Sequence, residues 1–394
     1  MMIAGWSPTS LDPAAPSGLP DVPQSVEEGK LEDRIISPPN CLRDIIAKNK
    51  DFYRFSVLTG VIKPLKGENP SYSFTNLNLR YRTWVYYLHC GLFLSSLTMI
   101  IYGIVALASP GAEKYASVII AEVFGILVQN VLLYPVIIFL RRELASSREI
   151  DTEVYNESMS YAMHLGRNLF LALTAMMICF IGFVVSVQPP DIGWLFGLYL
   201  IFIFTPSNCF MTGAFTFLVM EQRLSFHAMQ GAEKQVMDRS LTPSLYMQIR
   251  ESIDYRDKLS PLNWLMAAAV FNTICAMVLI GSLGAAVESE TEIDIFGGVM
   301  FTLSTFGRQI LVLLMLLNEM ANVNALSETM LHKLVQDAWG DDKIMRFDLY
   351  ILMKEKPLGS SLFYFRPSKW TLLVQIVSAV TGLIVAIFWA FVFA

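Results

Sequence analysis

The chain has 394 residues, of which 54% are hydrophobic and only 16% are charged, so it carries more apolar surface than the core of a soluble domain of this length would need. Its formal net charge of −5 argues against the broadly basic surface that nucleic-acid binding requires. These values indicate an integral membrane protein whose first partner is the lipid bilayer.

Residues 1–40 are rich in proline, serine and acidic residues and contain no long apolar run. A segment of this composition cannot bury enough apolar area to fold, so we predict a disordered cytosolic tail. We also expect no cleavable signal peptide, because the tail lacks the apolar stretch that one needs. From residue 41 to residue 82 the chain becomes basic with interspersed aromatic residues, which suits a segment lying against the membrane surface.

Seven apolar runs follow, each long enough to cross a hydrocarbon layer of about 30 Å as a helix of about 20 residues. The predicted spans are residues 83–108, 116–140, 168–188, 193–220, 262–284, 296–321 and 371–394. The short connection between the third and fourth spans predicts an antiparallel hairpin. The predicted fold class is therefore an all-α membrane protein with seven transmembrane helices, in which residues 41–394 form one channel-like domain.

The positive charges give the orientation. Of the 29 Lys and Arg residues, 27 fall in the N-terminal tail and in alternate connections, and one, Lys114, falls in the remaining connections. Because positive residues are retained in the cytosol, we predict a cytosolic N-terminus and an extracellular C-terminus. G-protein-coupled receptors have the opposite orientation, which argues against that class.

We predict no enzymatic activity, metal or cofactor. The four histidines are scattered, whereas a zinc enzyme would need several of them near one membrane face. No nucleophile and base stand out as a pair, so the sequence suggests no catalytic residue.

The connections on the predicted cytosolic side are long, at 27, 41 and 49 residues (141–167, 221–261 and 322–370). Apolar residues at spacings of three and four indicate that the fourth and sixth helices continue into the cytosol. We predict assembly helices at about 221–258 and 322–356, which pack against each other and against neighbouring subunits. A compact monomeric bundle is the alternative.

This organisation resembles the insect gustatory and odorant receptor superfamily, and most closely a divergent, non-insect gustatory-receptor-like protein. The resemblance covers roughly residues 41–394 and includes the cytosolic run Leu352-Met353-Lys354-Glu355-Lys356-Pro357-Leu358 and the triplet Phe363-Tyr364-Phe365. In the last span, Thr381 and the apolar residues after it fit the gustatory signature, whereas Gly382, Phe388 and Trp389 depart from it.

The resemblance implies a chemoreceptor: a ligand-gated cation channel of four identical subunits, in the plasma membrane rather than in internal membranes. It also implies a pore for permeating cations, lined by the last helix of each subunit. Since an apolar ring can close a pore by dewetting, the predicted pore and gate residues are Thr381, Ile384, Val385 and Phe388. Ordinary packing of these side chains remains an alternative, as does a seven-helix transporter or membrane scaffold without a pore of its own.

Polar residues inside the predicted spans mark a possible site for a small-molecule ligand. Arg308 lies near the middle of the sixth span, where an unpaired charge costs about 2.5 kcal/mol or more. Glu122, in the second span, is the only acidic residue that lies well inside another predicted span. The predicted ligand pocket comprises Glu122, Gln129, Asn130, Tyr199, Asn272, Arg308 and Gln309. The alternatives are an ion pair that only fixes helix register, and an interfacial anchoring role for Tyr199.

Overall fold

The computed structural model describes residues 40–62, 75–108, 147–148, 151–187, 190–258, 307–336, 343–361 and 366–374, together with single positions between 123 and 138. The chain divides into two units at Pro38, and all of the described residues belong to the second unit, Pro39–Ala394. The second unit therefore contains every described helix and strand.

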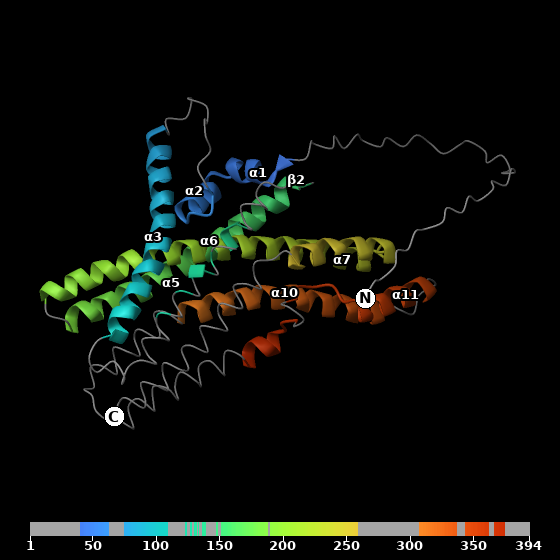
Figure 1. The fold of residues 1–394 in the computed structure, drawn as a ribbon. Helices are drawn as coiled ribbons and strands as arrows, with labels where there is room; N and C mark the ends of the chain where they lie inside the picture. The colour runs from blue at the N-terminus through green and yellow to red at the C-terminus, as the bar shows by residue number, and fades with distance from the viewer. Residues whose placement is uncertain are drawn as a thin grey trace, which may run out of the picture. The chain divides into compact units, whose positions relative to one another are not determined.

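Apart from turns and connecting segments, the described part is helical except for one short ladder (Figure 1). The helices are α1 (Leu42–Lys48), α2 (Lys50–Leu58), α3 (Thr75–Ala108), α5 (Thr152–Val187), α6 (Pro190–Met237), α7 (Pro243–Lys258), α10 (Arg308–Gln336) and α11 (Lys343–Glu355). The ladder is formed by the two-residue strands β1 (Asn40–Cys41) and β2 (Ser147–Arg148), which pair antiparallel. It joins the segment before α1 to the segment that leads into α5.

Three of the described helices are long and apolar enough to cross a membrane. Their candidate spans are Arg82–Val105, Thr152–Phe183 and Gly197–Met237. They contain most of the first, third and fourth spans predicted from the sequence. The predicted spans 116–140, 262–284 and 371–394 fall largely outside the described residues, and span 296–321 is described only from Gly307 onward.

Large apolar side chains on these helices remain exposed in the single chain. On α3, Phe93 and Ile104 are 61% and 65% exposed, and on α6 Leu195 is 71% exposed. Contiguous apolar surface of this kind is unfavourable in water and favourable against lipid tails. These helices therefore have the surface expected of membrane-embedded helices.

The helix α5 begins at Thr152, well before the predicted span at residue 168, and this extension was not predicted from the sequence. Its start is fixed by Asp151, whose Oδ1 accepts a hydrogen bond of 3.0 Å from the Glu153 amide. Along the extension, Tyr155, Met159 and Ala162 are buried at spacings of four and three. An amphipathic face therefore continues the helix outside the apolar stretch.

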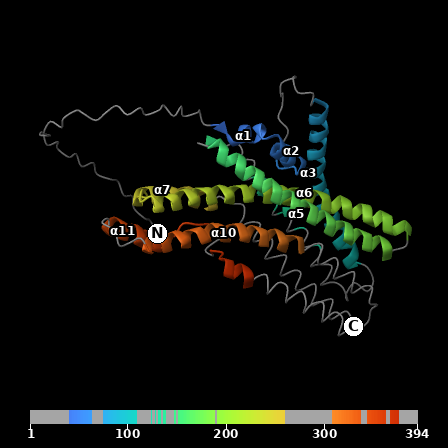
Figure 2. The same ribbon diagram turned by 180° about the vertical axis from the view of Figure 1, so that it is seen from behind.

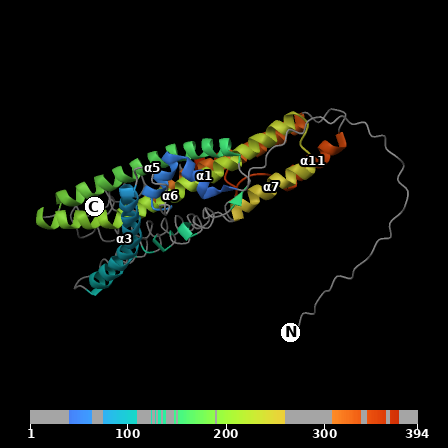
Figure 3. The same ribbon diagram turned by 90° about the horizontal axis from the view of Figure 1, so that it is seen from above.

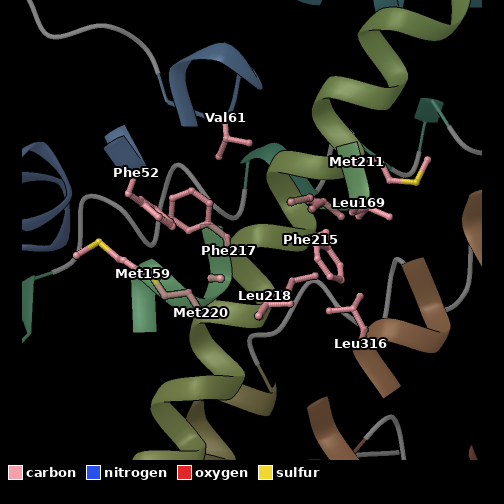
Figure 4. Packing of buried hydrophobic residues seen from close by; sticks show 14 of the residues in the cluster. Phe52, Val61, Met159, Leu169, Met211, Phe215, Phe217, Leu218, Met220 and Leu316 are labelled. Carbon is pink, nitrogen blue, oxygen red and sulfur yellow. The ribbon is translucent and has the colours of Figure 1, made fainter. Parts of the chain in front are cut away.

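The long helix α6 lies at the centre of the packing. In its most apolar stretch 71% of the residues are buried, against 33% for α3 and 22% for α5. Figure 4 shows side chains from α6, among them Met211, Phe215 and Leu218, packed against residues of α5 and α10. On the side of α2, the rings of Phe52 and Phe217 meet edge to face with their centroids 5.5 Å apart.

The helices α5 and α6 lie side by side in the views of Figures 1 and 3. Their contacts run in opposite directions: Met177 of α5 meets Asn208, whereas Tyr161 meets Arg223 further along α6. The two helices are therefore antiparallel, as the short connection between the predicted third and fourth spans indicates. Close approach is possible because Gly166 leaves room for the Thr216 side chain.

The helix α3 crosses α6 at a contact between Gly91 and Pro206 (Figure 1). A Cβ atom on Gly91 would lie 2.7 Å from Pro206 Cγ, so only glycine allows this approach. Pro206 lies inside α6, where the missing amide hydrogen is tolerated because the helix is supported by its neighbours.

Beyond its apolar stretch, α6 joins α7, α10 and α11 in a second bundle, which we call the distal bundle (Figure 2). Its buried residues are Met229, Ala232, Val236, Leu241, Tyr246, Ile253, Val323, Met330, Leu334, Leu349, Met353 and Leu358. An ion pair of 2.7 Å between Lys333 Nζ and Glu233 Oε1 joins α10 to α6. These helices occupy the ranges 221–258 and 322–356, for which an assembly role remains a prediction.

A tight turn separates α6 from α7. Ser240 donates to the Gln235 carbonyl (2.9 Å) and Arg239 to the Val236 carbonyl (3.3 Å), which is the Schellman pattern of a helix end. The next helix begins at once, because Thr242 Oγ1 accepts from the Leu245 amide and Pro243 occupies the first position of α7.

Candidate functional site

The most unusual side chain in the described part of the chain is Arg308, at the first residue of α10. It is 1% exposed and is among the largest fully buried side chains. Its Nη1 donates a hydrogen bond to Oδ1 of Asn208, which is buried on α6. The centre of its guanidinium lies 4.5 Å from the centroid of the Phe204 ring, one turn earlier on α6.

The described groups that contact Arg308 are therefore neutral. Among the described residues, no carboxylate lies within 4.0 Å of it, and its Nε has no hydrogen-bond partner. A desolvated cation–π contact contributes about 2 kcal/mol and a hydrogen bond to a charged group about 1.5–3 kcal/mol. Together these are comparable with the cost of a charge at this depth, about 2.5 kcal/mol or more.

The structure thus identifies a partner for Arg308 that the sequence analysis did not name. The proposed partner, Glu122, lies outside the described residues, so an Arg308–Glu122 pair stays a prediction. A signal for Asn208 was present in the sequence: it lies in the polar run Thr205-Pro206-Ser207-Asn208 in the middle of an otherwise apolar span.

A cluster of sulfur-containing and aromatic side chains adjoins the Arg308 centre. Its buried members are Met99, Phe180, Leu200 and Phe204. Tyr199 packs against this cluster, half-buried, with its hydroxyl 3.9 Å from Met99 Sδ. Tyr199 and Arg308, two of the predicted pocket residues, therefore adjoin one cluster, which they share through Phe204.

Asn130, another predicted pocket residue, is buried against α3. Its Nδ2 donates to Ser95 Oγ and to Ser96 Oγ, both at 3.1 Å. Ser95 lies one helical turn from Met99, on the same side of α3, so the Asn130 contacts approach the cluster around Tyr199. Polar side chains that bridge helices in this way stabilise packing within a membrane.

The other predicted site residues remain untested. Gln309 lies in α10, where its side chain is not described, and the remaining positions are outside the described residues. These are Glu122, Gln129, Asn272, Thr381, Ile384, Val385 and Phe388. Their roles in the pocket and the pore remain predictions.

A polar cluster that the sequence analysis did not predict joins α5, α6 and α10. Arg223 Nη2 and His227 Nε2 each lie 3.5 Å from Glu157 Oε1. The Arg223 guanidinium lies 4.7 Å from the centroid of the Tyr161 ring, and the Tyr161 hydroxyl donates a 3.0 Å hydrogen bond to Glu319. These contacts couple the three helices where the apolar packing around α6 meets the distal bundle.

After α11 the chain returns along the distal bundle. We call residues 356–361 and 366–368 the return segment. Asn324 Nδ2 donates to the carbonyl oxygens of Ser360 (3.0 Å) and Pro367 (2.8 Å), and Ser360 Oγ donates to Gln222 Oε1 (2.6 Å). Side chains of α10 and α6 therefore anchor the backbone of this segment.

The helix α7 also anchors the return segment. The Tyr246 hydroxyl donates a 2.7 Å hydrogen bond to the Lys356 carbonyl oxygen. Burial raises the pKa of Tyr246 to about 12, so the phenol stays protonated and donates over the whole physiological range. Three helices of the distal bundle thus contact the chain between α11 and the final helical residues.

Helical structure resumes after the return segment, at residues 369–374. The Thr371 amide donates to Ser368 Oγ (3.2 Å) and the Ser368 amide donates to Thr371 Oγ1 (2.8 Å). This reciprocal pair fixes the first turn in the manner of a capping box. The last predicted span, 371–394, therefore starts from an anchored and capped base.

Comparison with protein-family models and with curated protein sequences finds no match. Two solved structures of the insect olfactory receptor OR5 from Machilis hrabei are similar to this chain. One has a TM-score of 0.48, and the other, in complex with eugenol, has a TM-score of 0.50. Each is 13% identical to this chain in sequence. The similarity covers 87% of this chain and 98% and 99%, respectively, of the two receptor chains.

At this identity the likeness is one of fold. The architecture expected from the resemblance to insect odorant and gustatory receptors is thereby confirmed as a fold. Three of the described helices are long and apolar enough to cross a membrane and carry large exposed apolar side chains, which indicates an integral membrane protein.

Proposed function

We propose that this chain is one subunit of a homotetrameric, ligand-gated cation channel of the chemoreceptor, gustatory-receptor-like type. The observation that carries the proposal is the fold shared with an insect olfactory receptor over 87% of this chain and 99% of the receptor. That receptor was solved with eugenol bound, which favours a small-molecule ligand here too.

In this proposal the chain has seven transmembrane helices in the plasma membrane, with a cytosolic N-terminus and an extracellular C-terminus. The distribution of 27 of the 29 Lys and Arg residues supports this orientation. The distal bundle then lies in the cytosol, where it holds the four subunits together. The pore runs between the four last helices, past Thr381, Ile384, Val385 and Phe388.

The return segment supports the channel over a scaffold. Asn324, Gln222 and Tyr246 fix the base of the last helix to the distal bundle, so subunits that assemble through this bundle also set the positions of their last helices. A pore at the axis needs such control, because a gate of apolar side chains closes only within a narrow range of diameters.

The proposed ligand pocket adjoins the cluster around Phe204. It includes Arg308, Tyr199 and Asn130, and the predicted residues Glu122, Gln129, Asn272 and Gln309. A fully buried arginine with neutral partners is costly, and buried ionisable groups in membrane proteins commonly mark functional sites.

The oligomeric state is the first test. We expect the purified full-length chain to have the mass of four subunits by native mass spectrometry in detergent, and to conduct cations in planar bilayers. A clean monomer would contradict the proposal. A tetramer that never conducts would favour the alternative of a scaffold, and saturable solute uptake without unitary currents would favour a transporter.

A further inference from the structure

One edge of the Arg308 guanidinium carries a buried donor, Nε–H, without an acceptor in the part of the chain that the structure describes. Its Nη1 is turned to Asn208, whereas Nε is buried and has no hydrogen-bond partner. The remaining edge is the side-on pair of Nε–H and Nη2–H. This pair has the spacing of the two oxygens of a carboxylate, which arginine binds through two parallel hydrogen bonds.

Asn208 supplies a further donor near Arg308. With its Oδ1 turned to Arg308, Asn208 directs its Nδ2 to the thioether of Met177, at 3.9 Å. A thioether sulfur is a weak acceptor, so this amide has capacity for a better one. The centre therefore combines one full positive charge with unused hydrogen-bond donors.

The described side chains around Arg308 do not supply the missing negative charge. Phe204 covers one face of the guanidinium, and the neighbouring cluster is made of methionine, leucine and phenylalanine side chains. In such low-dielectric surroundings the Coulomb attraction between the arginine and an anion is stronger than in water, which offsets the cost of desolvating the anion. Burial of the arginine also means that few competing water molecules reach it.

From these contacts we propose that the Arg308 centre binds the carboxylate of a small organic acid. The two carboxylate oxygens accept from Nε and Nη2 of Arg308, and Asn208 holds the guanidinium in the required orientation. The inference rests on the proposed function in that it gives the chemical class of the ligand. Binding itself requires neither a pore nor a tetramer, and can be measured independently.

A carboxylate could also come from the chain itself, from Glu122. The two sources make different predictions. If Glu122 already pairs with Arg308, free acids will not bind, and Glu122→Gln will expose the site to them. If the site is open to ligand, Glu122→Gln will leave the affinity for acids unchanged.

The test uses the purified full-length protein and measures the thermal unfolding midpoint as acetate, butyrate or benzoate is added. Benzamide, which is neutral and nearly isosteric with benzoate, is the control compound. We expect at least one of the acids to raise the midpoint in a saturable manner and benzamide to have no effect. Equal effects of benzoate and benzamide, or no effect of any acid on the wild-type protein, would overturn the inference. A response confined to Glu122→Gln would identify Glu122 as the carboxylate that pairs with Arg308.

Two variants locate the binding. Arg308→Gln removes the charge and should weaken the response to acids about tenfold or more, because charge-assisted hydrogen bonds are lost. Asn208→Asp keeps the arginine but gives it a carboxylate partner within the chain. It should fold at least as stably as wild type and also lose the response, which keeps the test informative if Arg308→Gln does not fold.

The control for Asn208→Asp is Asn168→Asp, which adds the same charge at an exposed position of α5. We expect its response to acids to match that of wild type. A normal response in Asn208→Asp would show that acids bind elsewhere. A tetramer that conducts but does not bind acids would refute only the ligand class, and a monomer that binds them would refute only the channel.

Discussion

Arg239 adopts a backbone conformation that is unfavourable for its side chain. It closes α6 with a φ of 57°, in the left-handed region where a Cβ atom clashes with the backbone. We expect Arg239→Gly to stabilise the protein by about 1 kcal/mol, because glycine adopts this conformation without that clash. The measurement is the free energy of unfolding in detergent.

Arg239→Ala is the matched control for this change. Alanine also removes the charge and the long side chain, but it keeps the Cβ atom, so no stabilisation is expected. If alanine stabilised the protein as much as glycine, the strain would have to be assigned to the arginine side chain and not to the backbone.

Gly359, in the return segment, combines a positive φ with close packing. Its φ is 139°, and a Cβ atom there would overlap Asn324 Oδ1 and Arg366 Nη2. We expect Gly359→Ala to destabilise the protein by more than about 1 kcal/mol, since the backbone or the Asn324 anchor must move. Gly231→Ala, in α6 where a Cβ would meet nothing within 4 Å, should instead stabilise by about 0.5–1 kcal/mol. A loss at Gly231 as large as at Gly359 would contradict this explanation.

At this scale the sequence shows which residues need a partner but not which partner each has. The depth of Arg308 in an apolar run identifies it as a buried charge. Its pairing with Asn208, a hundred positions away in sequence, depends on the register of α6 against α10. Hydropathy and spacing carry no information on that register, so this contact of the candidate site could not be predicted.

Single glycines control how closely the helices pack. A Cβ atom on Gly166 of α5 would overlap Thr216 Oγ1 of α6 and approach the ring of Phe55. We expect Gly166→Ala to cost about 1–3 kcal/mol, because the α5–α6 contact must open. Gly182→Ala in the same helix, where a Cβ would meet nothing within 4 Å, should be neutral or stabilising. The comparison of their unfolding midpoints is the measurement, and equal losses would rule out helix contact as the cause.

The apolar stretches of α3, α5 and α6 could be located from the sequence because a membrane demands one composition over a fixed length. The extension of α5 to Thr152 could not, because its residues are mixed in polarity. Burial of Tyr155, Met159 and Ala162 against neighbouring elements stabilises that extension as a helix. Segments stabilised by tertiary contacts share no fixed length or composition that a sequence pattern could reveal.

For the whole molecule, the helix α11 presents exposed apolar side chains, with Phe347 61% exposed and Ile351 one turn away. If the distal bundle is the assembly region, this face lies between subunits. We then expect Phe347→Glu to dissociate the tetramer without unfolding the chain, as measured by native mass spectrometry and circular dichroism. Glu355→Gln, also exposed on α11, should leave the tetramer intact. An intact tetramer in Phe347→Glu would exclude this face from the interface.

The helical, membrane-type character of the fold was predictable because apolar length acts along a single chain, whereas the seven-helix count and the orientation of the termini remain predictions. The number of subunits and the course of a pore depend on surfaces that meet between chains, and no local pattern in one sequence determines how they meet. The distal bundle illustrates this: its helices were expected at about 221–258 and 322–356, but their common core around Tyr246 and Met330 is defined only by their mutual packing.

The anchoring of the return segment makes the distal bundle and the base of the last helix one cooperative unit. The hydrogen bonds that hold this segment come from Asn324, Gln222 and Tyr246, which also belong to helices of the bundle. A local unfolding event that separates these helices must therefore also release Ser360 and Pro367. The anchoring consequently disfavours one kind of partly unfolded state. In that state the bundle has unfolded while the base of the last helix stays in place.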